Sequence, residues 1–261
     1  MSSILYQIVI PFFLSAFVVI LITMIAERYG TKVGGILGTL PSTIVIAFVF
    51  ISINENELFA SRAAAVVPAE LGINIIFLLI FSLLVHRSTL LAFIGTFAIW
   101  TMLSFLLVFF NMENIWISIL IYIISLLFCF LILEKRKAVP SMGKVHIHYT
   151  LTKIMLRGVL AGIVIAIAVV LSNVGSIISG IFSVFPAILS STMLISVREH
   201  GPDFAAGMAK SMMIGLSSVA TYAVSIHVLY PQVGIGYGTV LSYVLAFCVT
   251  MILFTRRNRI I

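Results

Sequence analysis

The stretch GGILGTLPST, Gly34–Thr43, places three glycines and a proline inside an apolar run long enough to cross a membrane. A proline inside a helix has no N–H to donate and clashes with the carbonyl four residues before it, so the helix kinks or breaks. Hydrocarbon offers no water to replace the lost hydrogen bond, so irregular backbone is tolerated there only inside protein or beside a cavity. A second stretch, SGIFSVFPAIL at Ser179–Leu189, repeats the pattern. The two stretches predict a pair of broken helices within a membrane.

Composition supports a membrane environment for the whole chain. The 261 residues are 62% hydrophobic and 9% charged, whereas soluble domains are about a quarter charged. We therefore predict an all-α, polytopic integral membrane protein with nine transmembrane helices. The predicted spans are Leu5–Ala26, Val33–Ile53, Ala63–Val85, Leu90–Phe110, Ile115–Leu133, Lys153–Ser172, Ile177–Val197, Phe204–Leu229 and Gly236–Phe254.

The basic residues predict how the chain is oriented. Cytoplasmic loops of membrane proteins carry an excess of Lys and Arg. If the loop EKRK, residues 134–137, is cytoplasmic, nearly every other Lys and Arg falls on the same side, and only Arg62 lies outside. We expect a multi-pass protein of the cell (plasma) membrane, with its N-terminus outside and its C-terminus in the cytoplasm.

The two proline stretches belong to a longer internal similarity. At an offset of 145 residues, Gly35 aligns with Gly180 and Pro41 with Pro186, and at 144 Glu55 aligns with Glu199. The predicted topology inverts the second copy relative to the first. We therefore expect a first repeat at 1–110 (spans 1–4), a linker span with a basic cytoplasmic loop at 111–152, and a second repeat at 153–261 (spans 6–9). Inverted repeats with broken helices are typical of secondary transporters.

Both prolines fall at about the same depth, roughly 12 Å from the ends of their spans at 1.5 Å per residue. The breaks are expected to free the carbonyls of Leu37 and Phe182. Ordinary proline kinks, with glycines serving close helix packing, are the alternative interpretation. The predicted substrate-binding residues are Gly35, Gly38, Pro41, Ser42, Thr43, Gly180, Ser183, Pro186, Ser190 and Ser191.

Few charges lie within the predicted spans. Glu70 is an acid well inside span 3, and an ionisable group at membrane depth is a candidate for function because its desolvation is costly. We expect Glu70, and more weakly Lys210, to carry ion coupling, although Lys210 can also snorkel to the cytoplasm. Glu55 and Glu199 end the two proline-containing spans and are candidate gate residues, with helix capping as the alternative.

Several classes of function find no support in the sequence. The two cysteines, Cys129 and Cys248, have no CxxC partner, and no metal-binding or phosphate-binding motif accompanies them. We expect no metal site, no cofactor and no enzymatic activity. The net charge of +7 lies in short loops between apolar runs, so we expect no nucleic-acid partner.

The segment from Ser179 to Gly207 resembles the small four-span bacterial membrane proteins called GlpM-like, which carry a Phe-Pro opening and a later Ser-Glu-x-Gly turn. The matching residues are Gly180, Phe185, Pro186, Ser196, Glu199 and Gly201. The resemblance implies two fused, inverted copies of such a unit, and it implies no particular activity.

Taken together, these features predict a membrane transporter that moves a small solute by alternating access, coupled to a proton or a monovalent cation. A passive channel is one alternative, and a non-transporting assembly or lipid-handling protein is another. The expected partners are the lipid bilayer, an unidentified small solute and a second copy of the chain in a homodimer.

Overall fold

A computed structural model describes the backbone of residues 5–38, 40–136 and 150–257, and their side chains except at 5–6, 26–38, 135–136, 254 and 256–257. Every regular element in these residues is helical. The elements are η1 (Leu5–Val9), α2 (Ile10–Gly38), α3 (Ser42–Asn54), α4 (Glu57–Leu84), α5 (Thr89–Phe109), α6 (Ile115–Arg136), α7 (Leu151–Val170), η2 (Leu171–Asn173), α8 (Ser176–Ser183), α9 (Ala187–His200) and α10 (Pro202–Arg257).

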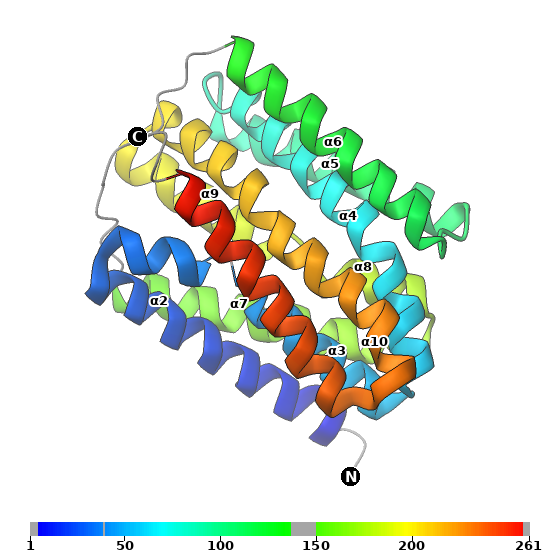
Figure 1. Ribbon diagram of the computed structural model, residues 1–261. Helices are drawn as coiled ribbons and strands as arrows, with labels where there is room; N and C mark the ends of the chain where they lie inside the picture. Colours follow the sequence, from blue (N-terminus) through cyan, green and yellow to red (C-terminus); the bar gives the residue numbers. More distant parts are fainter. Residues whose placement is uncertain (1–4, 39, 137–149, 258–261) are drawn as a thin grey trace.

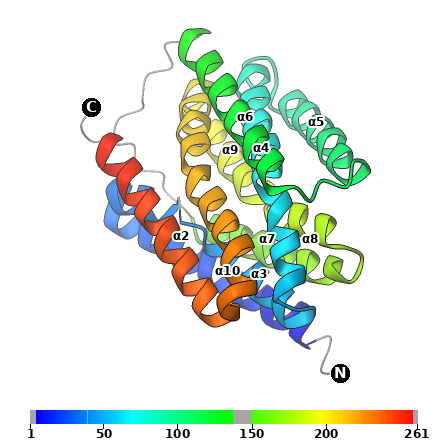
Figure 2. The same ribbon diagram turned by 45° about the vertical axis from the view of Figure 1, so that its right-hand side comes forward.

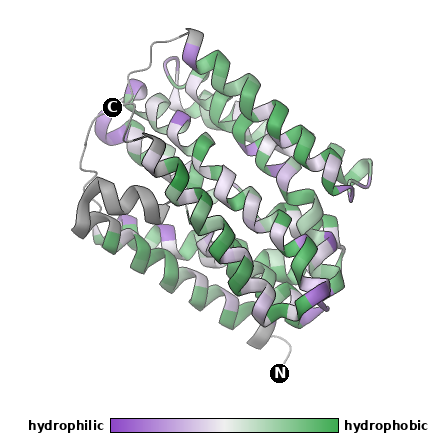
Figure 3. Cartoon of the chain, viewed as in Figure 1, coloured by the Kyte–Doolittle hydropathy of each residue, from purple (hydrophilic) through white to green (hydrophobic). Residues whose placement is uncertain are grey.

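The described residues contain seven helical segments long and apolar enough to cross a membrane, together with the shorter apolar helix α3. Many of their large apolar side chains are exposed. Hydrophilic residues gather near helix ends and turns (Figure 3). A bilayer would satisfy such a surface, because water offers no compensation for so many exposed apolar side chains.

Helix α4 is the centre of the bundle. It packs against α5, α6, α8 and α10, and its side chains are buried along most of its length. Helix α7 packs against α2 on another side of the bundle (Figure 1). Gly158 and Gly162 allow this approach, since a Cβ at Gly158 would lie 2.6 Å from the side chain of Ile20 and one at Gly162 would lie 2.7 Å from the Phe12 carbonyl.

Two regions differ from the predicted span boundaries. Helix α2 continues through residues 27–32, where a connector was expected, and ends at Gly38. The second predicted span is therefore divided between the end of α2 and α3. Helix α10 covers the last two predicted spans with a kink at Gly234, whose φ of 74° suits glycine, inside the expected connector. Its two halves fold back on each other (Figure 2).

Candidate functional site

Two proline-centred breaks interrupt the helices at the predicted positions. The first separates α2 from α3, and Pro41 immediately precedes the first residue of α3. The second separates α8 from α9, and Pro186 immediately precedes the first residue of α9. Each proline thus occupies a helix start, where its missing N–H costs no intrahelical hydrogen bond.

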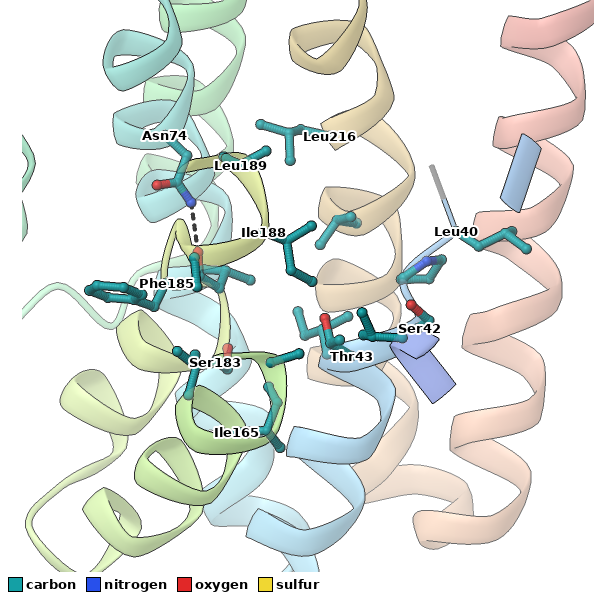
Figure 4. Close-up of a pocket in the computed structure, with 18 of the residues that line it drawn as sticks. Leu40, Ser42, Thr43, Asn74, Ile165, Ser183, Phe185, Ile188, Leu189 and Leu216 are labelled. Atoms are coloured by element: carbon teal, nitrogen blue, oxygen red, sulfur yellow. Dashed lines mark hydrogen bonds between the residues drawn. The ribbon is translucent and has the colours of Figure 1, made fainter. Parts of the chain in front are cut away.

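The two breaks line one cavity with a volume of about 160 Å³. Its walls come from α2, α3, α4, α7, α10 and the α8–α9 segment. Thr43 of α3 and Ile188 of α9 lie toward one another across it (Figure 4). Helices α3 and α9 both begin at this cavity and run away from it, so their N-termini contribute to the same wall.

Several predicted substrate-binding residues lie at this cavity. Pro41, Ser42, Thr43 and Ser183 line it. Pro186 is buried, and its neighbours Phe185 and Ala187 form part of the wall. Among these four lining residues, Ser183 already donates its hydroxyl proton to the Gly180 carbonyl at 2.6 Å, which leaves its oxygen as an acceptor.

Other predicted residues lie away from the wall. Ser190 and Ser191 follow one turn into α9 and are not among the lining residues. Ser191 donates to the carbonyl of Ile188 at 3.0 Å. Gly35 and Gly38 lie in the last turn of α2, and their surroundings fall outside the described side chains.

Gly180 serves a helix–helix contact. A Cβ at this position would collide with the Ala63 carbonyl and would lie 2.6 Å from Cγ1 of Val66. The absence of a side chain therefore lets α8 approach α4 closely, which is the packing role of small residues between membrane helices. This contact positions the start of the second break against the central helix.

Asn74 of α4 is a site residue that the sequence interpretation missed. Its Nδ2 donates to the Val184 carbonyl at 2.8 Å, within the second break (Figure 4). The expected free carbonyl at Phe182 is not free, because it accepts from the Phe185 N–H at 3.2 Å. The break instead exposes the carbonyl of Val184, and α4 supplies its donor. The sequence did contain a signal for this role, because Asn74 is a polar amide one turn after Glu70 within an apolar run.

Arg157 is a second missed residue. It was interpreted as an orientation signal, but it lies in the second turn of α7 and lines the cavity. Ala161 and Ile165 follow at intervals of four and line the same wall, as residues on one helical face do. The long guanidinium side chain thus places a permanent positive charge beside the two breaks.

Glu70 lies outside this cavity but close to its aromatic wall. Its side chain is fully buried, and Ser104 of α5 donates to its carboxyl group at 3.0–3.1 Å. Trp100, one turn before Ser104, packs edge-to-face on Phe185 at 4.9 Å between ring centroids. Phe185 also lines the cavity, so Trp100 contacts the cavity wall through this ring.

Lys210 of α10 is not a lining residue. It forms an ion pair with Glu134 at the end of α6, and its Nζ lies 5.2 Å from the ring centroid of Phe130. Through these contacts, Lys210 links α10 to α6 near the ends of the two helices.

Glu55 and Glu199 contact opposite ends of α7. Glu199 forms an ion pair with Lys153 in the first turn of α7. Glu55 accepts from Ser172, just beyond the other end of α7, at 3.1 Å. The Asn54 side chain donates to both Glu55 and Ser172. Because α7 has 20 residues and spans about 30 Å, these contacts define two ends of the molecule, the Glu199 end and the Glu55 end.

Within the described residues, no group of three His, Cys, Asp or Glu side chains could hold a metal ion. Cys129 is buried and Cys248 is exposed, and both thiols are free. Comparison with family models, with curated proteins and with solved structures gives no match.

Proposed function

We propose that the protein is a secondary transporter that moves a small solute across the membrane by alternating access, with proton or monovalent-cation coupling. The observation that supports this most directly is that two proline-broken helices begin at one cavity. Discontinuous helices meeting at a solute site are a recurring feature of secondary transporters.

The two ends of α7 give this proposal a gating scheme. Helix α3 runs from the cavity to the Glu55 end, and α9 runs from the cavity to the Glu199 end. Breaking one α7 contact while keeping the other would open the cavity to one side only. The proposal includes nine spans in two inverted four-helix repeats, as fused GlpM-like units would have, with a cytoplasmic C-terminus.

Glu70 is the proposed coupling group. A carboxyl group that is fully buried beside a single hydroxyl donor is costly to ionise, so its charge state depends on what surrounds it. Its neighbour Trp100 contacts Phe185 of the second break, which gives the acid a route of contact to the cavity wall. Loading the acid with a proton would thereby favour one arrangement of the break over another.

A flux assay tests the proposal. Proteoliposomes loaded with a pH-sensitive dye would be exposed to a panel of small solutes, with Pro41→Ala, Pro186→Ala and Glu70→Gln beside the parent. We expect solute-dependent proton movement that all three substitutions reduce. Equal fluxes in the parent and all three variants, for every transported solute, would show that the breaks and Glu70 are not the site. Solute movement without any proton or cation dependence would identify a channel.

A further inference from the structure

Glu70 and Asn74 share one face of α4 with Val66, because residues four apart lie one above another on a helix. This face is directed at α8 and its break, since Val66 lies against Gly180 and Asn74 donates into the break. Helix α5 lies beside the same face and supplies Ser104, which donates to Glu70. The acid therefore lies between α5 and the second break.

The register of α4 and α5 places Trp100 opposite Asn74. The two helices follow one another through a short connector and run antiparallel. Ser104 of α5 bonds to Glu70 of α4 at 3.0–3.1 Å, and ring contacts further along the two helices follow the same register. Asn74 lies one turn after Glu70. Trp100 lies one turn before Ser104, so it is at the level of Asn74.

Two buried polar atoms at this level have no hydrogen-bond partner in the part of the chain that the structure describes. They are Oδ1 of Asn74, an acceptor, and Nε1 of Trp100, a donor, on side chains that are 1% and 7% exposed. Oδ1 points away from Leu189 and Leu216 of the cavity (Figure 4). The indole of Trp100 lies close to the carboxyl group of Glu70 without the alignment of a hydrogen bond. Buried polar atoms without partners are costly, so this pair indicates a site beside Glu70 that binds something.

The mixture of donors and acceptors suits a proton. A carboxylate only accepts hydrogen bonds, so the O–H of Ser104 and the N–H of Trp100 serve the ionised form of Glu70. A protonated carboxyl group also has one O–H to donate. Oδ1 of Asn74 is an acceptor one turn away, and it gains a partner only when Glu70 is protonated.

Bound Na⁺ is the competing interpretation, because backbone carbonyls at the ends of broken helices coordinate cations in many transporters. Several carbonyls of the second break already accept hydrogen bonds here. Those that accept from backbone N–H groups are Ile181, Phe182 and Phe185. The carbonyl of Val184 accepts from Asn74. The N–H of Trp100 would also direct its partial positive charge at a cation beside Glu70, which disfavours Na⁺.

The elements packed against α4 contribute other titratable groups. Helices α3, α5 and α8 contain no Asp, Glu, His, Cys, Tyr, Lys or Arg. Helix α6 and the part of α10 before Gly234 bury, wholly or in part, Tyr122, Cys129, Lys210, Tyr222, His227 and Tyr230. Lys210 is neutralised by its ion pair with Glu134 at the end of α6, and His227 bonds to Ser61, more than two turns before Glu70. Tyr122 bonds to Ser217 of α10 at 2.9 Å.

We propose that Glu70, Trp100 and Asn74 form a proton-binding site with two hydrogen-bond arrangements. The ionised acid accepts from Trp100, and the protonated acid donates to Asn74. The proton comes from hydronium, bonds to one carboxyl oxygen and returns to water on release. Because Asn74 also holds the carbonyl of Val184, the proton changes the hydrogen bonding at the second break. This inference rests on the proposed function and narrows its coupling ion to the proton.

Infrared difference spectra of the full-length protein in nanodiscs test the site. The C=O band of a protonated carboxyl group is followed as the pH changes, and the part of the band that Glu70→Gln removes belongs to Glu70. Glu113→Gln, at an exposed carboxyl group, is the matched control and should leave that part in place. Replacing choline by Na⁺ at fixed pH should also leave it unchanged.

Two variants should move the titration in opposite directions. Trp100→Phe removes a donor to the ionised acid, so half-protonation of Glu70 should move up by about one pH unit. Asn74→Leu removes the acceptor of the protonated acid, so half-protonation should move down by about one pH unit. Trp116→Phe is the control for the indole, since Trp116 is 76% exposed, and it should move nothing. If Asn74→Leu is too unstable for measurement, Trp100→Phe against Trp116→Phe decides alone.

Three outcomes overturn the inference: shifts of the same sign or no shift in Trp100→Phe and Asn74→Leu, a Glu70 band that Na⁺ removes at fixed pH, and no Glu70 band at any pH. Residues with a purely structural role would not give opposite shifts. Flux coupled to Na⁺, with a band that Na⁺ removes, would keep the transporter and remove the proton site. Conversely, opposite shifts without flux of any solute would keep the proton site and remove transport.

Discussion

The side chain of Asn74 donates from Nδ2 to the backbone carbonyl of Val184 at 2.8 Å, and this bond joins the central helix to the break between α8 and α9. Asn74 is 1% exposed, so in this structure the bond is shielded from bulk water. The break is therefore held in place by a residue from another part of the chain.

Removing that donor should destabilise the protein. Asn74→Leu is close in size but leaves the Val184 carbonyl without its donor, which should lower the free energy of unfolding by about 1–3 kcal/mol. Ser82→Ala is the control, since Ser82 is buried in the same helix and donates only to its own turn, at Leu78. Unfolding by SDS in mixed micelles measures both, and an Asn74→Leu protein as stable as the parent would show that the bond does not hold the break.

Gly180 and Gly175 form a matched pair for testing the contact between α8 and α4. Gly180→Ala would place a methyl group against Ala63 and Val66, and the expected loss of stability is about 1–3 kcal/mol. At Gly175, the N-cap of α8, a Cβ meets nothing within 4 Å, so Gly175→Ala should cost less than Gly180→Ala, at most the roughly 0.5–1 kcal/mol of a weaker N-cap. The same unfolding measurement compares them, and equal effects at both positions would contradict the close contact.

Glu70→Gln should separate proton movement from solute movement. The substitution keeps the size and the contact with Ser104 but cannot gain or lose a proton. Solute-driven proton uptake and the pH dependence of solute flux should both disappear, while exchange of labelled solute across the membrane continues. Glu113→Gln is the control, because Glu113 lies in a connector and contacts Ser176. Unchanged proton uptake in Glu70→Gln would exclude Glu70 as the coupling group.

The pair Lys153 and Glu199 can be tested by exchanging its charges. Glu199→Lys alone places two like charges at the start of α7 and should reduce flux, because the contact at the Glu199 end no longer closes. Combining it with Lys153→Glu restores opposite charges and should return much of the flux, with an interaction energy of about 1 kcal/mol for a partly exposed pair. If the double variant is no better than the single one, the ion pair has no gating role.

The helical class and the positions of both breaks could be predicted from the sequence, because hydropathy and the covalent structure of proline act locally. To predict that the two breaks lie close together in space, we also had to assume an internal repeat. Residues 27–32 show the limit of local reasoning, since polar residues there predicted a connector and the backbone is helical. Helix and connector differ little in polarity near a membrane face.

Asn74 and Arg157 could not be assigned from the sequence, because a side chain's role depends on which way its helix faces. Arg157 fits a charge-bias pattern as well as it fits a cavity wall, and only the packing of α7 against its neighbours distinguishes the two. Gly180 differs from these two residues. It lies in the sequence motif that predicted the site, but in the structure it packs against α4. A motif identifies a region of the fold, whereas packing assigns each residue within it.

Sided labelling of Thr43→Cys tests alternating access most directly. The protein, with Cys129 and Cys248 replaced by Ser, would be reconstituted and treated with a membrane-impermeant thiol reagent from each side separately. We expect Glu199→Lys to raise labelling from the Glu199 end and lower it from the Glu55 end, and Glu55→Gln with Ser172→Ala to do the reverse. Labelling that rises from both ends together would indicate a channel, and a cysteine that stays unreactive from both ends in every variant would indicate a sealed bundle that does not transport.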